Sequence, residues 1–86
     1  MISGKNIVLT GCNSGIGLEV LKLLVKGDNK ILAVDKNISN IVEFPADKVI
    51  PMQTDVSSKE AVDAIFEKAE AELGFINIFY ANAGYP

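Results

Sequence analysis

The stretch Thr10-Gly11-Cys12-Asn13-Ser14-Gly15-Ile16-Gly17 decides the fold of this 86-residue chain. It follows the apolar run Ile7-Val8-Leu9, which is typical of a buried strand, and precedes apolar residues at helical spacing over residues 16–26. Glycines in such a turn let the main chain approach a ligand closely, and the first N–H groups of the helix attract an anion. The stretch therefore predicts a strand, a pyrophosphate-binding loop and a helix, with Gly27 as a left-handed cap at the helix end.

Three further apolar segments predict strands over residues 30–34, 48–53 and 75–81. Pro51 has no N–H to donate to a ladder, so its strand should lie at an edge of the sheet. The connection over residues 36–47 contains few apolar residues, and we expect at most a short turn of helix there.

A second helix is predicted over residues 57–73, before Gly74. The sequence Ser57-Ser58-Lys59-Glu60 is typical of a capping box, in which the Ser57 hydroxyl accepts a main-chain N–H. Right-handed crossovers between parallel strands, with the Pro51 strand at an edge, give the strand order 3-2-1-4. The chain is thus predicted to be one α/β domain over residues 1–86, a partial doubly wound Rossmann fold whose two main helices lie on opposite faces of the sheet.

The composition excludes several classes of function. The chain has 8 Lys+Arg against 11 Asp+Glu and no basic run, so we do not expect nucleic acid as a partner. One cysteine and no histidine allow neither an intramolecular disulfide nor a cysteine/histidine zinc site, and no metal is predicted. The apolar runs are far shorter than the roughly 20 residues that span a bilayer, so we expect no membrane partner. A reducing, cytoplasmic setting fits this composition best.

Asp35 directly follows the second predicted strand, 24 residues after Gly11. A dinucleotide-binding unit places a carboxylate at this point, where it accepts hydrogen bonds from the adenosine ribose and repels a 2′-phosphate. Lys36 offers a cation to such a phosphate, but we expect NAD as the cofactor rather than NADP. A solvated aspartate at a strand end is the alternative interpretation.

Three motifs together carry a resemblance to a known family. The loop over residues 10–17 has the form T-G-x-x-x-G-x-G, Asp55-Val56 follows the third predicted strand, and Asn82-Ala83-Gly84 follows the fourth. The sequence thus resembles the cofactor-binding N-terminal part of a short-chain dehydrogenase/reductase. Ala81 departs from the family, because many members carry a further asparagine there.

The resemblance implies roles for these residues in binding NAD(P). Asp55 would bond the adenine amino group, Val56 would pack on the adenine ring, and the Asn82 motif would line the adenosine ribose side. Each motif could instead be only a turn beside a strand or helix. The candidate cofactor-binding residues are Gly11, Asn13, Ser14, Gly15, Ile16, Gly17, Asp35, Lys36, Asp55, Val56, Asn82, Ala83 and Gly84.

No catalytic residue is predicted in this chain. The family uses a serine and a Tyr-x-x-x-Lys pair that lie beyond the stretch matched here, and neither Tyr80 nor Tyr85 has a lysine four positions later. We therefore expect a fragment of a longer NAD(P)-dependent oxidoreductase that acts on an alcohol or a carbonyl and is inactive alone. A non-catalytic nucleotide-binding or assembly module is the alternative.

Three further expectations concern single residues and assembly. Cys12 should be a small buried thiol rather than a nucleophile. Ser14 should either cap the first helix or contact the pyrophosphate. The strand over residues 75–81 is apolar and contains no lysine or proline, so a homo-oligomer joined through this strand or through exposed sheet faces is expected.

Overall fold

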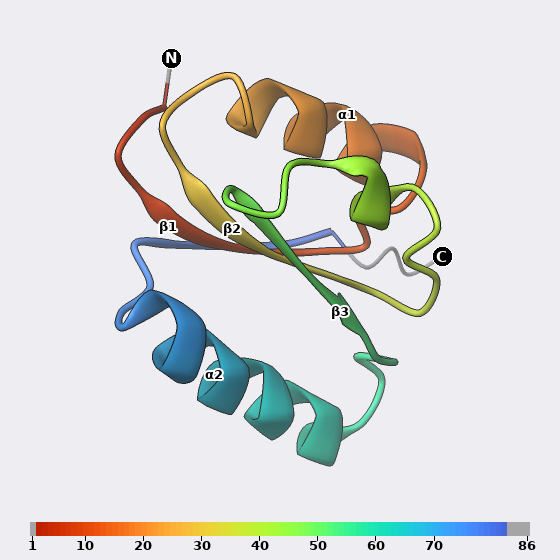
Figure 1. The fold of residues 1–86 in the computed structure, drawn as a ribbon. Coiled ribbons are helices and arrows are strands. Elements are labelled where there is room, and N and C mark those ends of the chain that lie inside the picture. Colours follow the sequence, from red (N-terminus) through yellow and green to blue (C-terminus); the bar gives the residue numbers. More distant parts are fainter. Residues whose placement is uncertain (1, 83–86) are drawn as a thin grey trace.

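The computed structural model describes residues 2–82. Its four-stranded sheet is parallel and has the order β3-β2-β1-β4, with a helix on each side (Figure 1). The elements are β1 (Asn6–Thr10), α1 (Gly15–Leu24), β2 (Lys30–Asp35), the 3-10 turn η1 (Ile41–Glu43), β3 (Val49–Gln53), α2 (Lys59–Leu73) and β4 (Ile78–Ala81). The predicted α/β class and strand order 3-2-1-4 are confirmed.

Pro51 lies on the edge strand β3, where it stands opposite Ala33 of β2. This position confirms the reasoning from its missing N–H, because only the outer side of an edge strand can dispense with a donor. The connection before β3 contains only η1, as expected for a segment with few apolar residues.

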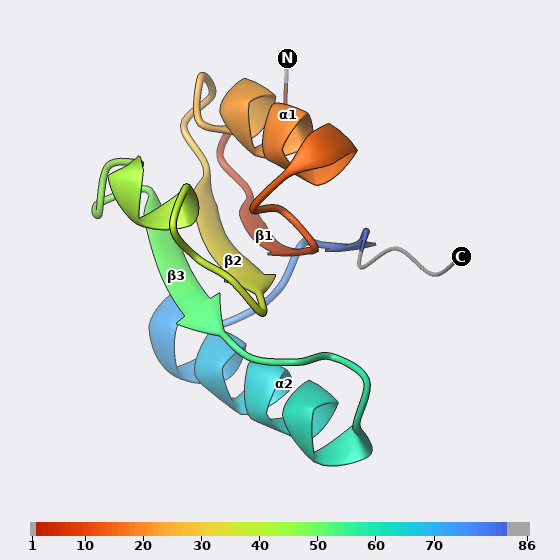
Figure 2. The ribbon, with the colours of Figure 1, turned by 90° about the vertical axis from the view of Figure 1, so that its right-hand side faces the viewer.

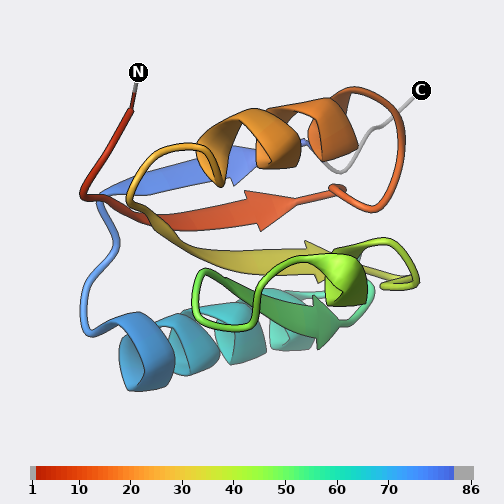
Figure 3. The same ribbon diagram turned by 45° about the horizontal axis from the view of Figure 1, so that its top comes forward.

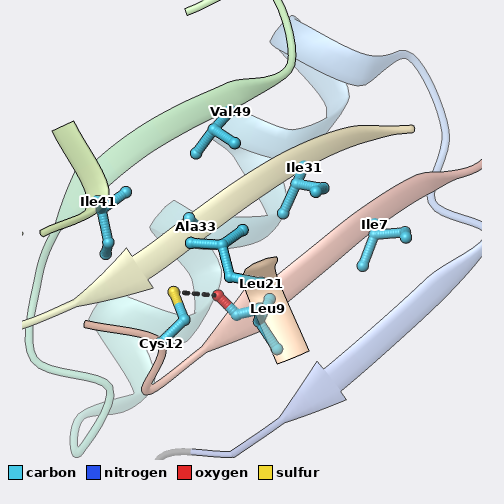
Figure 4. Packing of buried hydrophobic residues seen from close by; sticks show 8 residues of the cluster. All are labelled: Ile7, Leu9, Cys12, Leu21, Ile31, Ala33, Ile41 and Val49. Carbon is cyan, nitrogen blue, oxygen red and sulfur yellow. Dashed lines mark hydrogen bonds between the residues drawn. The ribbon is translucent and has the colours of Figure 1, made fainter. Parts of the chain in front are cut away.

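The sheet is buried on both faces, as the continuous apolar runs of β1 and β2 predict. On one face α1 and η1 cover a cluster of eight buried side chains, and on the other face α2 covers a second cluster (Figures 2 and 4). The first cluster is Ile7, Leu9, Cys12, Leu21, Ile31, Ala33, Ile41 and Val49. The second is Val8, Leu32, Val34, Ile65, Ala69 and Leu73. Side chains that alternate along each strand therefore enter opposite clusters.

Helix α2 begins at Lys59, and its cap lies one residue later than predicted. The cap is Ser58, whose Oγ accepts the N–H of Ala61 at 3.1 Å, and not Ser57. Ser57 lies in the preceding connection, where its N–H donates to Asp55 Oδ1 at 2.9 Å. Gly74 ends the helix with a φ of 84°, a conformation that glycine adopts without strain.

The interpretation of Gly27 as a left-handed cap is wrong. Helix α1 ends at Leu24, and Val25, in right-handed conformation, caps it. Gly27 is required for space instead, since a Cβ there would overlap the Ile2 carbonyl and come within 2.9 Å of Asn29 Nδ2.

Strand β4 is shorter at its start than the predicted residues 75–81. Asn77 precedes it and exchanges two hydrogen bonds with Asn6, with its N–H donating to the Asn6 carbonyl and its Oδ1 accepting the Asn6 N–H, each at 2.8 Å. The side chain of Asn77 thus replaces a main-chain acceptor, and the regular ladder begins at Ile78.

Candidate functional site

The connections that follow the first three strands gather at one edge of the sheet. All four strands point toward this edge, where the glycine loop, the start of the β2–η1 connection and the β3–α2 connection lie near one another (Figure 3). In an open parallel sheet this is where ligands bind, and the switch in strand order lies between β1 and β4. A cavity of about 380 Å³ opens here, lined by Gly11, Ser14, Val34, Asp35, Lys36, Thr54, Asp55, Val56, Ser57 and Asn82.

The glycine loop leaves β1 and enters α1 through backbone conformations and one close contact that require glycine. Gly11 and Gly15 have φ values of 66° and 58°, in the left-handed region. A Cβ on Gly17 would overlap the Gly11 carbonyl oxygen and come within 2.6 Å of Asn82 Nδ2. Glycine at position 17 therefore lets the first turn of α1 approach the loop, whose residues Gly11 and Ser14 line the cavity.

Ser14 stands at the N-cap position of α1 in extended conformation, with a φ of −155°. Its hydroxyl makes no capping hydrogen bond, and the residue lines the cavity. Of the two alternatives for Ser14, the structure does not support side-chain capping.

Asp35 is the last residue of β2, so the strand extends one residue beyond the predicted end. Its Oδ2 accepts the N–H of Asn13 at 3.0 Å, and its Oδ1 accepts the N–H of Asn37 at 3.3 Å. An ionised carboxylate has about four acceptor positions, so both oxygens retain capacity for further donors. The cavity therefore presents an oriented anionic acceptor.

Asp55 and Lys36 both line the cavity. The Ser57 N–H, followed by the Ser57 hydroxyl, holds the pKa of Asp55 below its usual range, and Lys36 adds a smaller effect in the same direction. The Lys36 Nζ is 3.9 Å from Asp55 Oδ2, an exposed ion pair that adds little stability. Gln53 Nε2 donates to the Lys36 carbonyl at 2.8 Å and so ties the end of β3 to the end of β2.

Asn82 joins the end of β4 to the glycine loop. Its N–H donates to Thr10 Oγ1 at 3.1 Å, and its Nδ2 donates to the Gly11 carbonyl at 3.2 Å. The predicted residues Ala83 and Gly84 lie outside the described residues.

Seven of the predicted residues line one cavity, and four others belong to the glycine loop. Gly11, Ser14, Asp35, Lys36, Asp55, Val56 and Asn82 line the cavity. Gly15 and Gly17 shape the loop, Ile16 is 73% exposed, and Asn13 is buried. Sequence reasoning missed Val34, Thr54 and Ser57, which line the cavity beside predicted residues, so their adjacency in sequence was the available signal.

Cys12 lies in the first core cluster with no exposed surface (Figure 4). Its Sγ is 3.6 Å from the Leu9 carbonyl oxygen and 3.7 Å from that of Val34. Burial, and then the negative charge of Asp35, raise the pKa of the thiol to about 12. Because the thiolate is the reactive form, this residue is a packing group, as predicted.

Residues 2–82 contain no group of three or more His, Cys, Asp or Glu side chains that could hold a metal ion. The same part of the chain has no helix whose length and apolar character would suffice to cross a membrane.

Comparison with known proteins finds relatives along nearly the whole chain. The family model described as short chain dehydrogenase matches residues 5–86. A fatty acyl-CoA reductase from Mycobacterium tuberculosis is 32% identical over 90 residues, which cover 96% of this chain and 30% of the relative.

Solved structures show the same fold with similar identity. The 3-ketoacyl-(acyl-carrier-protein) reductase from Brucella melitensis, complexed with NADH, has a TM-score of 0.80 and 29% identity, covering 90% of this chain and 33% of that chain. The L-sorbose reductase from Gluconobacter frateurii, complexed with NADPH and L-sorbose, has a TM-score of 0.85 and 32% identity, covering 98% of this chain and 35% of that chain. The chain thus spans about a third of the length of these proteins.

Proposed function

Because the chain belongs to the short-chain dehydrogenase family, we propose that it supplies the adenosine-binding half of an NAD-dependent oxidoreductase that interconverts an alcohol and a carbonyl. The single observation that carries this proposal is the cavity at the carboxyl edge of the sheet, which the glycine loop, Asp35 and Asp55 line together. The chain spans about a third of its relatives, so we place the proton-transferring groups in a part of the family's length outside these residues. We propose a cytoplasmic setting, which suits a single protonated cysteine.

Each part of the cavity suits one part of an adenosine diphosphate. The N–H groups at the start of α1 would bind the pyrophosphate, because Gly17 lets the first turn of the helix approach Gly11, which lines the cavity. Asp35 would accept the ribose hydroxyls, while Asp55 would accept the adenine amino group and Val56 would pack on the ring. A nicotinamide dinucleotide, when bound, supplies hydride transfer, and the residues described here bind and orient its other half.

We expect the chain to bind NAD more tightly than NADP, because the Asp35 carboxylate accepts ribose hydroxyls and repels a 2′-phosphate. The related solved structures carry NADH in one case and NADPH in another, so this preference has to be measured. In calorimetric titrations, Asp35→Ala should weaken NAD binding about tenfold or more, since hydrogen bonds to a charged group contribute about 1.5–3 kcal/mol. NADP binding should be unchanged or improved.

Asp28→Ala is the control for this experiment, because Asp28 is an exposed aspartate in the connection between α1 and β2, at the opposite end of the strands. It should leave both affinities unchanged. Equal affinity of the unaltered chain for NAD and NADP would contradict the role of Asp35, and no binding of either would contradict the proposed function.

We also propose that copies of the chain associate through β4. This strand pairs with β1 on one side, and its Phe79 and Tyr80 are 40% and 41% exposed. Phe66 of α2 stacks on Phe79 with ring centroids 5.4 Å apart, which extends the apolar surface beside the strand. An edge strand with apolar neighbours can pair with a second chain.

Light scattering over a dilution series tests this association. We expect a mass above that of one chain, reduced to the monomer by Phe79→Glu. Phe75→Glu is the control, because Phe75 is 64% exposed but precedes the strand. A mass that stays monomeric at high concentration would contradict the proposal.

A further inference from the structure

The buried side chain of an asparagine in the glycine loop holds the connection that follows β2. Asn13 is 7% exposed, and its Oδ1 accepts the N–H groups of Asn40 at 2.8 Å and Ile41 at 3.2 Å. Its Nδ2 donates to Ser39 Oγ at 3.4 Å, and its carbonyl accepts Asn40 Nδ2 at 2.8 Å. Both the oxygen and the nitrogen of the Asn13 side-chain amide thus form hydrogen bonds with residues 39–41.

The same connection is fastened to Asp35 from its other end. The Asn37 N–H donates to Asp35 Oδ1 at 3.3 Å, and the Ser39 N–H donates to Asn37 Oδ1 at 3.0 Å. The N–H of Asn13 donates to Asp35 Oδ2 at 3.0 Å. Asp35, the following connection and Asn13 therefore form a closed ring of hydrogen bonds, so neither carboxylate oxygen can turn without breaking a bond.

The position of this ring matters because two opposite charges stand side by side at the cavity. Asp35 repels a 2′-phosphate, whereas the neighbouring Lys36 has a side chain that is 74% exposed and would attract one. If the connection could shift, the carboxylate could turn away and Lys36 could approach the phosphate. A fixed connection keeps the carboxylate in place and leaves the repulsion dominant.

We propose that Asn13 is a positioning residue for cofactor choice, an inference that rests on the proposed function. The preference for NAD over NADP then depends on a side chain outside the cofactor cavity. Asn13 lies outside the residues that line that cavity, so it acts through Asp35 and the connection over residues 36–40. Asparagine suits this role because Oδ1 accepts two N–H groups while Nδ2 donates. An aspartate would lose the donor and add a second negative charge near Asp35.

The chain offers a matched control at the other end of the sheet. Asn29 is 2% exposed, its Oδ1 accepts the Lys5 N–H at 3.0 Å, and its Nδ2 donates to the carbonyls of Ile2 at 3.0 Å and Leu24 at 2.8 Å. Asn29→Ala therefore removes a similarly buried and bonded amide far from Asp35. A purely structural effect of losing such an amide should appear in both variants.

The experiment titrates NAD and NADP separately into the full chain and into Asn13→Ala, Asn29→Ala, Asp35→Ala and the double variant Asn13→Ala/Asp35→Ala. The measured quantity is the ratio of the NADP dissociation constant to the NAD dissociation constant. Asn13→Ala should lower this ratio about tenfold, the loss expected when one hydrogen bond to a charged group is weakened, and Asn29→Ala should leave it unchanged. In the Asp35→Ala background, Asn13→Ala should have no further effect on the ratio, because the two residues act through one ring.

Equal weakening of NAD and NADP by Asn13→Ala would overturn the proposal, as would additive effects in the double variant. Failure of the unaltered chain to bind either dinucleotide would instead overturn the proposed function, and this inference with it. If circular dichroism shows that Asn13→Ala does not fold, Asn40→Ala replaces it, since it removes the bond to the Asn13 carbonyl and keeps the main-chain bond to Oδ1. It should lower the ratio by a smaller factor, and an unchanged ratio would overturn the proposal.

Discussion

Gly17→Ala is expected to abolish dinucleotide binding and to lower the free energy of unfolding by about 3 kcal/mol, the upper part of the range for overpacked sites. The new Cβ would overlap the Gly11 carbonyl oxygen and come within 2.6 Å of Asn82 Nδ2. To relieve this overlap, the first turn of α1 must move away from the glycine loop. This movement displaces the N–H groups proposed to bind the pyrophosphate. Calorimetric titration of NAD and chemical denaturation measure the two effects.

Gly27→Ala separates the loss of binding from the loss of stability. Its Cβ would also overlap a main-chain carbonyl, that of Ile2, and come within 2.9 Å of Asn29 Nδ2, but this position is at the other end of α1. We expect similar destabilisation with unchanged NAD affinity of the folded chain. Unchanged NAD affinity in Gly17→Ala would contradict the proposed place of the pyrophosphate.

Leu32→Ala is expected to cost about 3 kcal/mol of stability, within the range of about 2–5 kcal/mol for removing a buried leucine side chain. Leu32 has no exposed surface and lies in the cluster that joins β2 to α2. A domain of this length has on the order of 4–13 kcal/mol in total, so one such cavity removes a large share. Urea denaturation followed by circular dichroism measures the change.

Leu23→Ala is the matched control, because Leu23 of α1 is 60% exposed. The same atoms are removed from a position that buries little apolar surface, and we expect a change of less than about 0.5 kcal/mol. Equal effects of the two substitutions would show that the sheet face covered by α2 is not a packed core.

The sequence by itself determined the elements and their order. Continuous apolar runs predicted strands buried on both faces, and the missing N–H of Pro51 placed β3 at the edge, so the order β3-β2-β1-β4 followed. The glycine spacing, Asp35 and Asp55-Val56 predicted one binding edge, and the structure brings them to one cavity. These signals are local, because they depend on a residue's own backbone limits or on its neighbours in sequence.

Only the tertiary structure decided which residues support that cavity and why particular residues stand at the helix ends. Ser58 rather than Ser57 caps α2, the Ser57 N–H donates to Asp55, and Gly27 is needed for space beside Ile2 rather than for a left-handed turn. Asn13 was predicted as part of the loop, yet its side chain is buried and bonded to residues 26–28 positions later in the chain. Such roles depend on which N–H and carbonyl groups the packed segments bring within about 3 Å, and no local pattern specifies that distance.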